Sequence, residues 1–232
     1  MGGRIGIICA ADTELAPFLP HICGCTVTEH AMLRFYEGTI GEVPVVALYS
    51  GVCKVNAALA VQLLIDRFGV AAVINAGTAG GMEESMRIFD TVVSTEAAYH
   101  DVADDILTEF HPWMPTIYFA ADPGLLAAAK RAAQAEAEQE RVRFGRMVTG
   151  EAFIEDEHRA EILEKYAPLS VDMETAAIAH VCYVNRVPFL AVRTITDTAE
   201  HAGMAQFEEN CDRAAEIAKD FTLRLISEFK PL

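Results

Sequence analysis

Several features are scarce or missing in this sequence, and each absence excludes a class of protein. No apolar run approaches the roughly 20 residues that a membrane-spanning helix needs. Basic residues are few: 18 Lys and Arg stand against 34 Asp and Glu, which gives a net charge of −16. A chain this acidic is poorly suited to nucleic acid or to an anionic membrane surface. We therefore expect neither a nucleic acid nor a membrane as partner.

Signals for metals and bound cofactors are also missing. Cys23 and Cys25 are one residue closer than the usual zinc-knuckle pair, and no second pair follows. His100 and Asp101 alone are a weak metal signal. The glycine-rich stretch 77–81 is not a dinucleotide fingerprint and has no phosphate-loop lysine. We expect no metal and no cofactor.

The first residues lack targeting signals. The apolar stretch at the N-terminus is too short for a secretory signal, and Gly6 stands where myristoylation requires Ser or Thr. The expected compartment is therefore the cytoplasm.

No Ser/Pro/Gly-rich linker, low-complexity run or internal repeat divides the 232 residues, of which 52% are hydrophobic. This predicts a single domain over 1–232. Apolar runs and helical spacings alternate along the chain. The runs predict strands at 4–10, twice within 35–49, and at 71–75, 90–95, 142–149 and 189–192, with helices at 55–68, 123–138, 174–180 and 207–229. The order predicts an α/β fold, a three-layer αβα domain around a central mixed, largely parallel sheet.

Local signals support several of these boundaries. Gly69 is a plausible C-terminal cap for the helix at 55–68, and Asp122 before Pro123 is a helix start. The glycine-rich stretch 76–81 follows a predicted strand and predicts a turn, where backbone amides can approach a ligand. A tight turn without any ligand is the competing interpretation.

Three acids follow predicted strands. Glu174 and Asp197 stand at the ends of successive strands in a β-α-β order, and Glu14 comes just after the first strand. Carboxyl ends of parallel strands meet at one crevice, where two carboxylates can have their pKa values pushed apart. With the hydroxyl of Thr78 nearby, the acids indicate water chemistry on a hydroxyl-bearing ligand. The competing interpretation is structural, since a helix dipole favours Glu174 and turns favour Asp197.

Seven short motifs, spread along nearly the whole chain, resemble those of a known family. The shared pieces, in order, are residues 5–8 with Glu14, 50–55, 74–81, 99–101, 150–154, 171–174 and 193–197. Together they resemble the 5′-methylthioadenosine/S-adenosylhomocysteine nucleosidases of the wider nucleoside phosphorylase fold. The resemblance implies irreversible hydrolysis of the N-glycosidic bond of an adenine nucleoside.

The resemblance also implies the work of individual residues. It makes Asp197 the donor of a proton to purine N7, Glu14 the base that positions the water, and Glu174 the carboxylate that holds the ribose hydroxyls. The transition state resembles an oxocarbenium ion. The implied substrate-binding residues are Met173 beside the sugar, Arg193 and Thr78 at the water, Phe153 stacked on the purine, Ile154 at its edge, and Asp172, Val52 and Phe207.

The chain departs from the family pattern at several positions. Thr78, Asp172, Cys53 and Glu151 stand where the family usually has Ser, Glu, Gly and Asp. Segment 102–118 differs most, and in relatives this region lines the pocket for the 5′ substituent. The substituent that this chain accepts is therefore open among methylthio, homocysteinyl, 5′-deoxy and futalosine-type groups.

Two other functions remain open. One is a phosphate-dependent purine nucleoside phosphorylase, although the carboxylate of Glu14 would repel phosphate and only Arg193 and Arg87 could approach it. The other is a purine-nucleoside binding protein without catalysis.

Segment 110–119 is unusually apolar for a loop and contains the only tryptophan. Exposed apolar loops often mark interfaces, and in relatives the region meets a second subunit. We expect a homodimer; the alternative is a loop folded back onto its own core.

Overall fold

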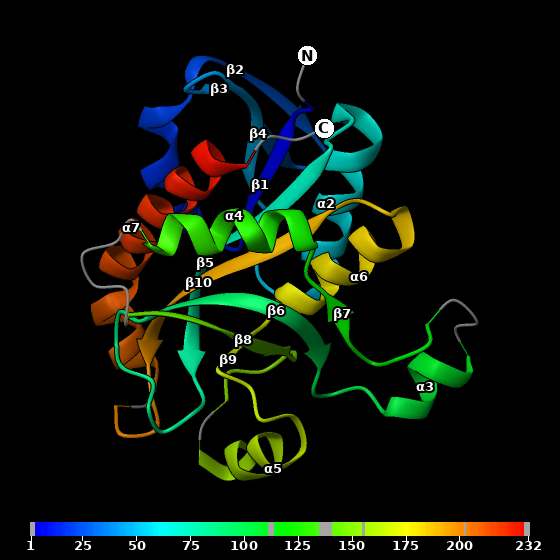
Figure 1. The fold of residues 1–232 in the computed structure, drawn as a ribbon, viewed down its shortest axis with the longest axis vertical. Helices are drawn as coiled ribbons and strands as arrows, with labels where there is room; N and C mark the ends of the chain where they lie inside the picture. Colours follow the sequence, from blue (N-terminus) through cyan, green and yellow to red (C-terminus); the bar gives the residue numbers. More distant parts are fainter. Residues whose placement is uncertain (1–2, 111–113, 135–140, 155, 202, 230–232) are drawn as a thin grey trace.

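The computed structural model describes residues 3–110, 114–134, 141–154, 156–201 and 203–229 (Figure 1). The strands are β1 (Ile5–Cys9), β2 (Cys23–His30), β3 (Leu33–Ile40), β4 (Val43–Tyr49), β5 (Ala72–Gly81), β6 (Thr91–Tyr99), β7 (Phe119–Ala120), β8 (Val142–Thr149), β9 (Ser170–Asp172) and β10 (Phe189–Asp197). The helices are α1 (Asp12–Leu15), α2 (Lys54–Phe68), α3 (Asp104–Glu109), α4 (Pro123–Gln134), α5 (Asp156–Tyr166), α6 (Thr175–Asn185) and α7 (Met204–Glu228), with a 3₁₀ turn η1 (Ala16–His21).

The strands form one mixed sheet, which confirms the predicted α/β class. β1 lies between β4 and β5 and runs parallel to both, and β4, β3 and β2 continue as an antiparallel meander. On the other side β5, β10, β6, β8 and β9 pair in a ring that returns to β5. The sheet is mixed, as predicted. Five of the ten pairings between described strands are parallel and five antiparallel, so parallel pairings do not outnumber antiparallel ones. Two of these antiparallel pairs, β10–β6 and β5–β9, belong to the ring.

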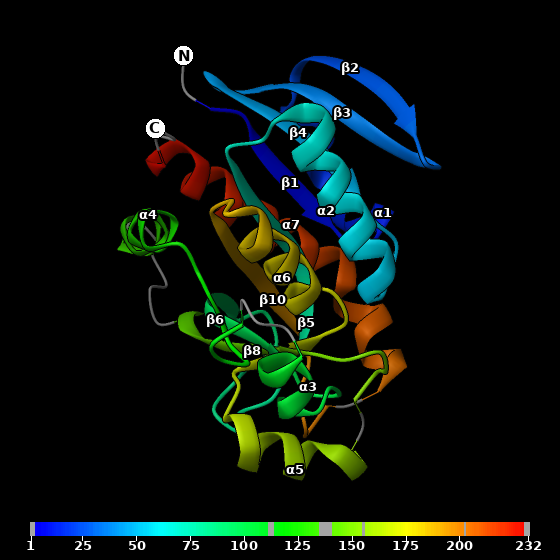
Figure 2. The same cartoon turned by 90° about the vertical axis from the view of Figure 1, so that its right-hand side faces the viewer.

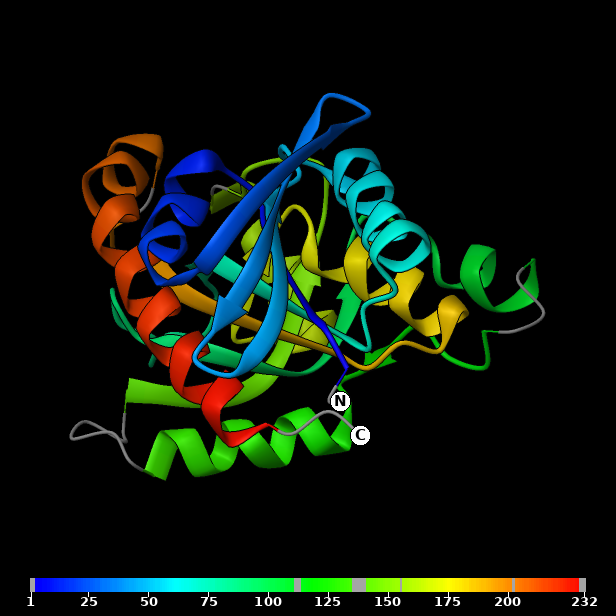
Figure 3. The same cartoon turned by 90° about the horizontal axis from the view of Figure 1, so that it is seen from above.

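Helices cover both faces of the central strands. Alternate residues of β1 enter two separate apolar clusters: Ile5 and Ile7 pack with α4 and α7, whereas Ile8 packs with α2 and α6. Figure 2 shows α2 and α6 side by side in front of β1, β5 and β10, and Figure 3 shows α7 on the opposite side of β1 from α2. Because both faces are covered, β1 is buried and apolar along its whole length, and β10 is buried throughout, including Arg193 and Asp197.

Several predicted boundaries are confirmed. α2 ends at Phe68, and Gly69 has a φ of 58° in the left-handed region, where glycine carries no steric cost. The Oδ1 atom of Asp122 accepts the backbone N–H of Leu125 at 2.9 Å, which caps α4 as expected. The predicted end of that helix, at about residue 138, lies outside the described residues.

The predicted glycine-rich turn at 76–81 is wrong, because these residues continue β5. The glycines there make room for acids. A Cβ on Gly77 would lie 2.5 Å from Oε1 of Glu14, and one on Gly80 would lie 3.1 Å from Oδ2 of Asp197. Glycine is therefore required for the close approach of carboxylates to the strand, and not for a turn.

The apolar segment 110–119 divides between surface and core. Phe110 is 68% exposed, while Met114 and Phe119 are 3% and 2% exposed and belong to the core. The interpretation of a loop folded onto its own core is thus correct for Met114 and Phe119. Trp113 lies outside the described residues. Among the described helices, none combines the length and the hydropathy of a transmembrane span.

Candidate active site

An open pocket of about 830 Å³, its mouth included, lies where β1, β5, β9 and β10 end. All eleven residues predicted from the sequence line it: Glu14, Val52, Thr78, Phe153, Ile154, Asp172, Met173, Glu174, Arg193, Asp197 and Phe207. The sequence therefore predicted which side chains meet in one crevice. Met204, at the start of α7, also lines the pocket and was missed, because a lone methionine carries no chemical signal.

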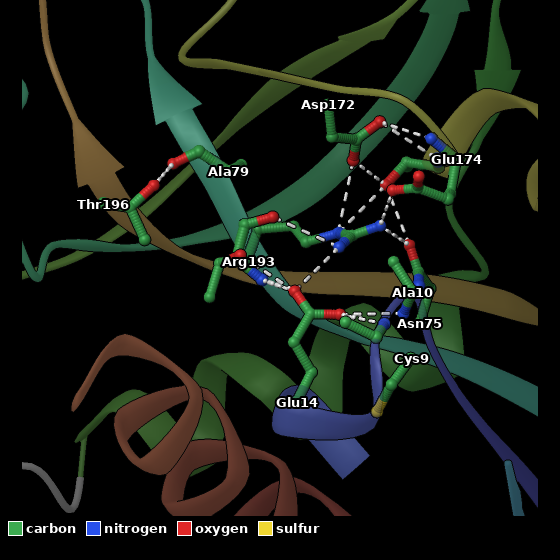
Figure 4. Close-up of polar contacts among 12 residues, drawn as sticks. Cys9, Ala10, Glu14, Asn75, Ala79, Asp172, Glu174, Arg193 and Thr196 are labelled. Carbon is green, nitrogen blue, oxygen red and sulfur yellow. Dashed lines mark hydrogen bonds and ion pairs between the residues drawn. The ribbon is translucent and has the colours of Figure 1, made fainter. Parts of the chain in front are cut away.

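Glu14 is held by four donors. Its Oε1 atom accepts the backbone N–H of Thr78 at 2.7 Å and the Thr78 hydroxyl at 2.8 Å. Its Oε2 atom accepts the backbone N–H groups of Ala10 at 2.8 Å and Ala11 at 3.2 Å (Figure 4). The short helix α1, directly after β1, turns this side chain back over the end of its own strand. The carboxylate is thus fixed against β5 in a buried position.

Arg193 is the centre of the charged side of the pocket. It comes from β10, its exposure is 0%, and its guanidinium donates to the Thr78 carbonyl at 3.1 Å. Three carboxylates surround it: Asp172 at 3.2 Å, Glu174 at 3.3 Å and Glu14 at 3.7 Å (Figure 4). Burial alone would lower the pKa of Arg193, but these carboxylates raise it above its ordinary value. The guanidinium therefore stays charged and bridges the three acids.

Asn75 and Thr175 complete this network and were not singled out in the sequence. The Asn75 Oδ1 atom accepts the Arg193 guanidinium at 2.9 Å and the Thr175 hydroxyl at 2.8 Å. The Asn75 amide donates to the Ile8 carbonyl at 2.9 Å. The presence of an asparagine inside a predicted buried strand could have indicated Asn75, because a buried side-chain amide needs hydrogen-bond partners.

Asp172 lies in the pocket lining, but its oxygens already have partners inside the protein. Oδ1 accepts the Thr149 hydroxyl at 2.6 Å and the Thr175 backbone N–H at 3.0 Å. Oδ2 accepts the Thr175 hydroxyl and pairs with Arg193. These contacts cap the start of α6 and orient Arg193.

Glu174 occupies the cap position of α6 and is only 3% exposed. Its Oε1 atom accepts the Cys53 backbone N–H at 3.0 Å, and Oε2 faces Arg193. Burial, reinforced by the nearby carboxylates Asp172 and Glu14 against the opposing pull of Arg193 and the Cys53 N–H, raises the pKa of Glu174 to about 7. Cys53 reaches this carboxylate with a φ of 81°, a strained value for a residue with a side chain.

Asp197 ends β10 on the other side of the pocket, where it is 2% exposed. Its Oδ1 atom accepts the Thr196 hydroxyl at 2.8 Å, and its Oδ2 atom lies against Gly80. Burial raises the pKa of Asp197 above its ordinary value, despite the opposing effect of the Thr196 hydroxyl. A carboxyl of this kind is suited to carry a proton into the pocket.

Apolar side chains line the pocket together with Asp197. The rings of Phe153 and Phe207 meet edge to face, with centroids 6.5 Å apart and an interplanar angle of 76°. Ile154 is buried, Met173 is half-buried, and Val52 lies at the mouth with 46% exposure. This arrangement can accept a flat, largely apolar ring beside the acid. In the described part of the chain, no group of three or more His, Cys, Asp or Glu side chains is placed to hold a metal ion.

Comparisons with known proteins agree on one family. The model of the phosphorylase superfamily matches residues 4–227. The 5′-methylthioadenosine/S-adenosylhomocysteine nucleosidase of Anoxybacillus flavithermus is 37% identical, over 97% of this chain and 98% of its own. The nucleosidase structure from Neisseria meningitidis with methylthio-immucillin-A has a TM-score of 0.90 and 30% identity, covering 98% of this chain and all of that one. The Colwellia psychrerythraea nucleosidase with adenine has a TM-score of 0.87 and 32% identity, covering 99% and 97%.

Proposed function

Because the chain belongs to the 5′-methylthioadenosine/S-adenosylhomocysteine nucleosidases of the phosphorylase superfamily, we propose that its pocket divides their reaction among Glu14, Glu174 and Asp197. The protein is an N-glycosyl hydrolase, which cleaves the N-glycosidic bond of these nucleosides and releases adenine. Residues 4–227 match the superfamily model, in keeping with a single catalytic domain over 1–232. Water and an adenine nucleoside are the only reactants, with no cofactor.

The observation that carries this assignment is the position of Glu14 beside Thr78 and Arg193. The Glu14 carboxylate accepts four hydrogen bonds from the ends of β1 and β5, which fix it at the bottom of the pocket. A water between Glu14, Thr78 and Arg193 would be oriented by groups that do not move. Glu14 would then accept its proton as it attacks the anomeric carbon.

Phosphate is disfavoured as the attacking group by the same contacts. The guanidinium of Arg193 is the cation nearest to Glu14 in the described contacts, and it is shared among Glu14, Asp172 and Glu174. Arg87 pairs instead with Asp90. An anion in this position would meet three carboxylates around one cation. The contacts therefore favour hydrolysis over phosphorolysis.

Asp197 and Glu174 act on the two sides of the bond that breaks. We assign Asp197 to protonate N7 of the purine, because it lines the pocket and its burial raises the pKa of the carboxyl, which favours the protonated form. We assign Glu174 to the vicinal ribose hydroxyls, where its negative charge stabilises the oxocarbenium-like sugar. Phe153, Phe207 and Ile154 would enclose the purine, with Met173 beside the sugar and Val52 at the mouth.

The assay is adenine release from 5′-methylthioadenosine, S-adenosylhomocysteine, 5′-deoxyadenosine and futalosine-type substrates, with and without added phosphate. Phosphate-independent release is expected. Release that requires phosphate would show a phosphorylase, and binding without turnover would show a non-catalytic protein. The substrate panel also identifies the 5′ group, which segment 102–118 leaves undetermined.

We assign the assembly to a homodimer through one apolar face. The exposed apolar residues of α2, α6 and the region of α3 are Val55, Leu59, Ile106, Phe110, Tyr183 and Val184, with exposures from 41% to 76%. Figure 2 shows the three helices on the same side of the molecule. Contiguous exposed apolar surface marks protein interfaces. Light scattering at micromolar concentration is expected to give twice the chain mass, and a fully active monomer would contradict this assignment.

Two further assignments concern the cellular compartment and the metabolic pathway. All six cysteines lie in the described part and are free thiols there, which suits a reducing compartment. We assign the protein to the cytoplasm and to methionine salvage. Fractionation of the source cells tests the first assignment, and loss of growth on methylthioadenosine as the sulfur source after gene deletion tests the second.

A further inference from the structure

A second cluster of charged residues lies beside the pocket, outside the proposed reaction. Lys54 opens α2, Asp101 follows β6, and Glu151 follows β8. The Lys54 ammonium donates to both carboxylate oxygens of Asp101 at 2.9 Å. These two side chains are only 22% and 29% exposed, so the pair is partly shielded from water.

The same three residues are also joined through the backbone. The Glu151 backbone N–H donates to Oδ2 of Asp101 at 3.0 Å. The Glu151 carboxylate accepts the backbone N–H of Lys54 at 2.9 Å. α2 has no capping side chain of its own, so Glu151 caps it from a loop 97 residues further along the chain. The result is a closed set of contacts among three loops.

Two of these loops lead to different parts of the pocket, and the loop of Asp101 joins them. The residue before Lys54 is Cys53, whose N–H holds Glu174 at 3.0 Å on the ribose side. Two residues after Glu151 comes Phe153, which lines the purine side with Ile154. The His100 ring packs where a Cβ of residue 150 would lie, so Gly150 lets the two loops touch. The purine side and the ribose side are thus connected outside the pocket by Lys54, Asp101 and Glu151.

The backbone of Cys53 needs such a restraint. Its φ of 81° and ψ of 163° are unfavourable for a residue with a side chain, and they persist only when surrounding contacts enforce them. The Cys53 N–H bond to Glu174 and the Lys54 N–H bond to Glu151 enforce them from two directions. Loss of either contact would let the Cys53 backbone relax to a more favourable conformation. The Cys53 N–H group that donates to Glu174 would then shift.

We propose that Lys54, Asp101 and Glu151 are positioning residues, which hold the purine loop 150–154 at a fixed distance from Glu174. The inference rests on the proposed function, since the purine side and the ribose side of the pocket must both contact one nucleoside when its glycosidic bond breaks. A shift of the two sides relative to each other would misalign the transition state and leave each side able to bind its own part of the ligand.

The experiment compares two ligands on the same variants. Asp101→Asn and Lys54→Met are each expected to lower kcat/KM for 5′-methylthioadenosine by about tenfold, the scale of one charge-assisted hydrogen bond. Adenine, which touches the purine side alone, is expected to bind within about threefold of the parent affinity. Because the two residues act as one unit, the double variant is expected to lose about tenfold and not a hundredfold. Lys54→Arg is expected to keep most of the activity.

A matched control lies at the C-terminal end of α7. Glu228 pairs with Arg131 at 3.1 Å with 43% and 52% exposure, and neither residue lines the pocket or joins the three loops. Glu228→Gln is expected to leave both measurements unchanged. The proposal is overturned if Asp101→Asn turns over within twofold of the parent, if adenine affinity falls as far as turnover, or if the single losses multiply in the double variant.

Failure of the proposed function would be seen separately, in the parent protein. If the parent releases no adenine from any substrate of the panel, amide hydrogen exchange decides the positioning role. Asp101→Asn is then expected to speed exchange in 150–154 by about tenfold relative to Glu228→Gln, since a local contact is lost. Unchanged exchange would overturn the proposal.

Discussion

The two sides of the pocket are built from different contacts. On the side of Glu14 and Arg193, charged atoms are buried and held by many partners, several of them backbone groups of β1 and β5. On the side of Asp197, two aromatic rings line the pocket with the carboxyl, which accepts a hydrogen bond from the Thr196 hydroxyl. The first arrangement holds its charged groups through many contacts, and the second holds Asp197 through fewer; burial raises the pKa of an acid on each side, Glu174 and Asp197.

This difference agrees with the roles that we propose for Glu14, Glu174 and Asp197. Charge that develops on the sugar and water is best met by groups that need not reorganise. A carboxyl that donates a proton to the purine needs surroundings that stabilise its ionised form only weakly. Substitutions on either side test whether this contrast decides function.

The largest effect is expected on the charged side. Glu14→Gln keeps the size of the side chain and removes the base, so hydrolysis is expected to fall by roughly 10³-fold or more. Nucleoside binding, measured by calorimetry, is expected to persist. Asp12→Asn is the control, because Asp12 is exposed on the same short helix. Hydrolysis by Glu14→Gln at the parent rate would remove Glu14 from the reaction.

The next effect is expected on the apolar side. Asp197→Asn preserves shape but carries no transferable proton, so turnover is expected to fall by at least about 10²-fold in steady-state assays. Asp212→Asn, at an exposed position of α7, is the control. If the folded Asp197→Asn protein works at near-normal rates, the apolar side supplies binding only.

The pKa of Glu174 links the charged side to stability. In the folded chain this pKa is raised from 4.5 to about 7. Between these two pH values the folded chain holds a proton on Glu174 that the unfolded chain has released. This stabilisation is present below pH 4.5 and is lost as the pH rises through 7. Its size is on the order of 3 kcal/mol, from about 1.4 kcal/mol per unit of pKa.

Glu174→Gln removes this dependence. In urea unfolding at pH 8 the variant is expected to be more stable than the parent, whereas at pH 5 the two are expected to be similar. Turnover is expected to fall at both values, because the ribose carboxylate is gone. A stability difference that does not change with pH would contradict the raised pKa.

The smallest effect concerns the strained support of Glu174. Cys53→Gly relieves a φ of 81° but adds freedom to the unfolded chain, so a net gain of about 1 kcal/mol is expected. Thermal melting is expected to rise by roughly 3 °C for a chain of this size. Cys211→Ser, in α7, controls for loss of a thiol. A decrease in stability would mean that the Cys53 side chain itself stabilises the loop.

Much of this protein could be predicted from local sequence. The helix α2, its end at Gly69 and the capped start of α4 depend on apolar spacing and on single capping residues, which neighbours in the chain determine. Glu14, Thr78, Glu174 and Asp197 were predictable as neighbours, because parallel strands end on one side of a sheet. The other seven predicted pocket residues came from the family resemblance and not from local pattern.

Other features depend on contacts between distant parts of the chain. Residues 76–81 carry turn composition but form a strand, since Glu14 and Asp197 occupy the space of the missing side chains. The ring of β5, β10, β6, β8 and β9 and its antiparallel junctions arise from pairings between segments far apart in sequence. Such pairings leave no local pattern.

The sequence by itself determined the fold class, the family and the identity of the acids, because these depend on residue types and their order. Only the tertiary structure decided that one arginine bridges three carboxylates and that burial raises the pKa values of Glu174 and Asp197. The physical reason is that charge and desolvation act through space, so they depend on which distant strands the fold brings together.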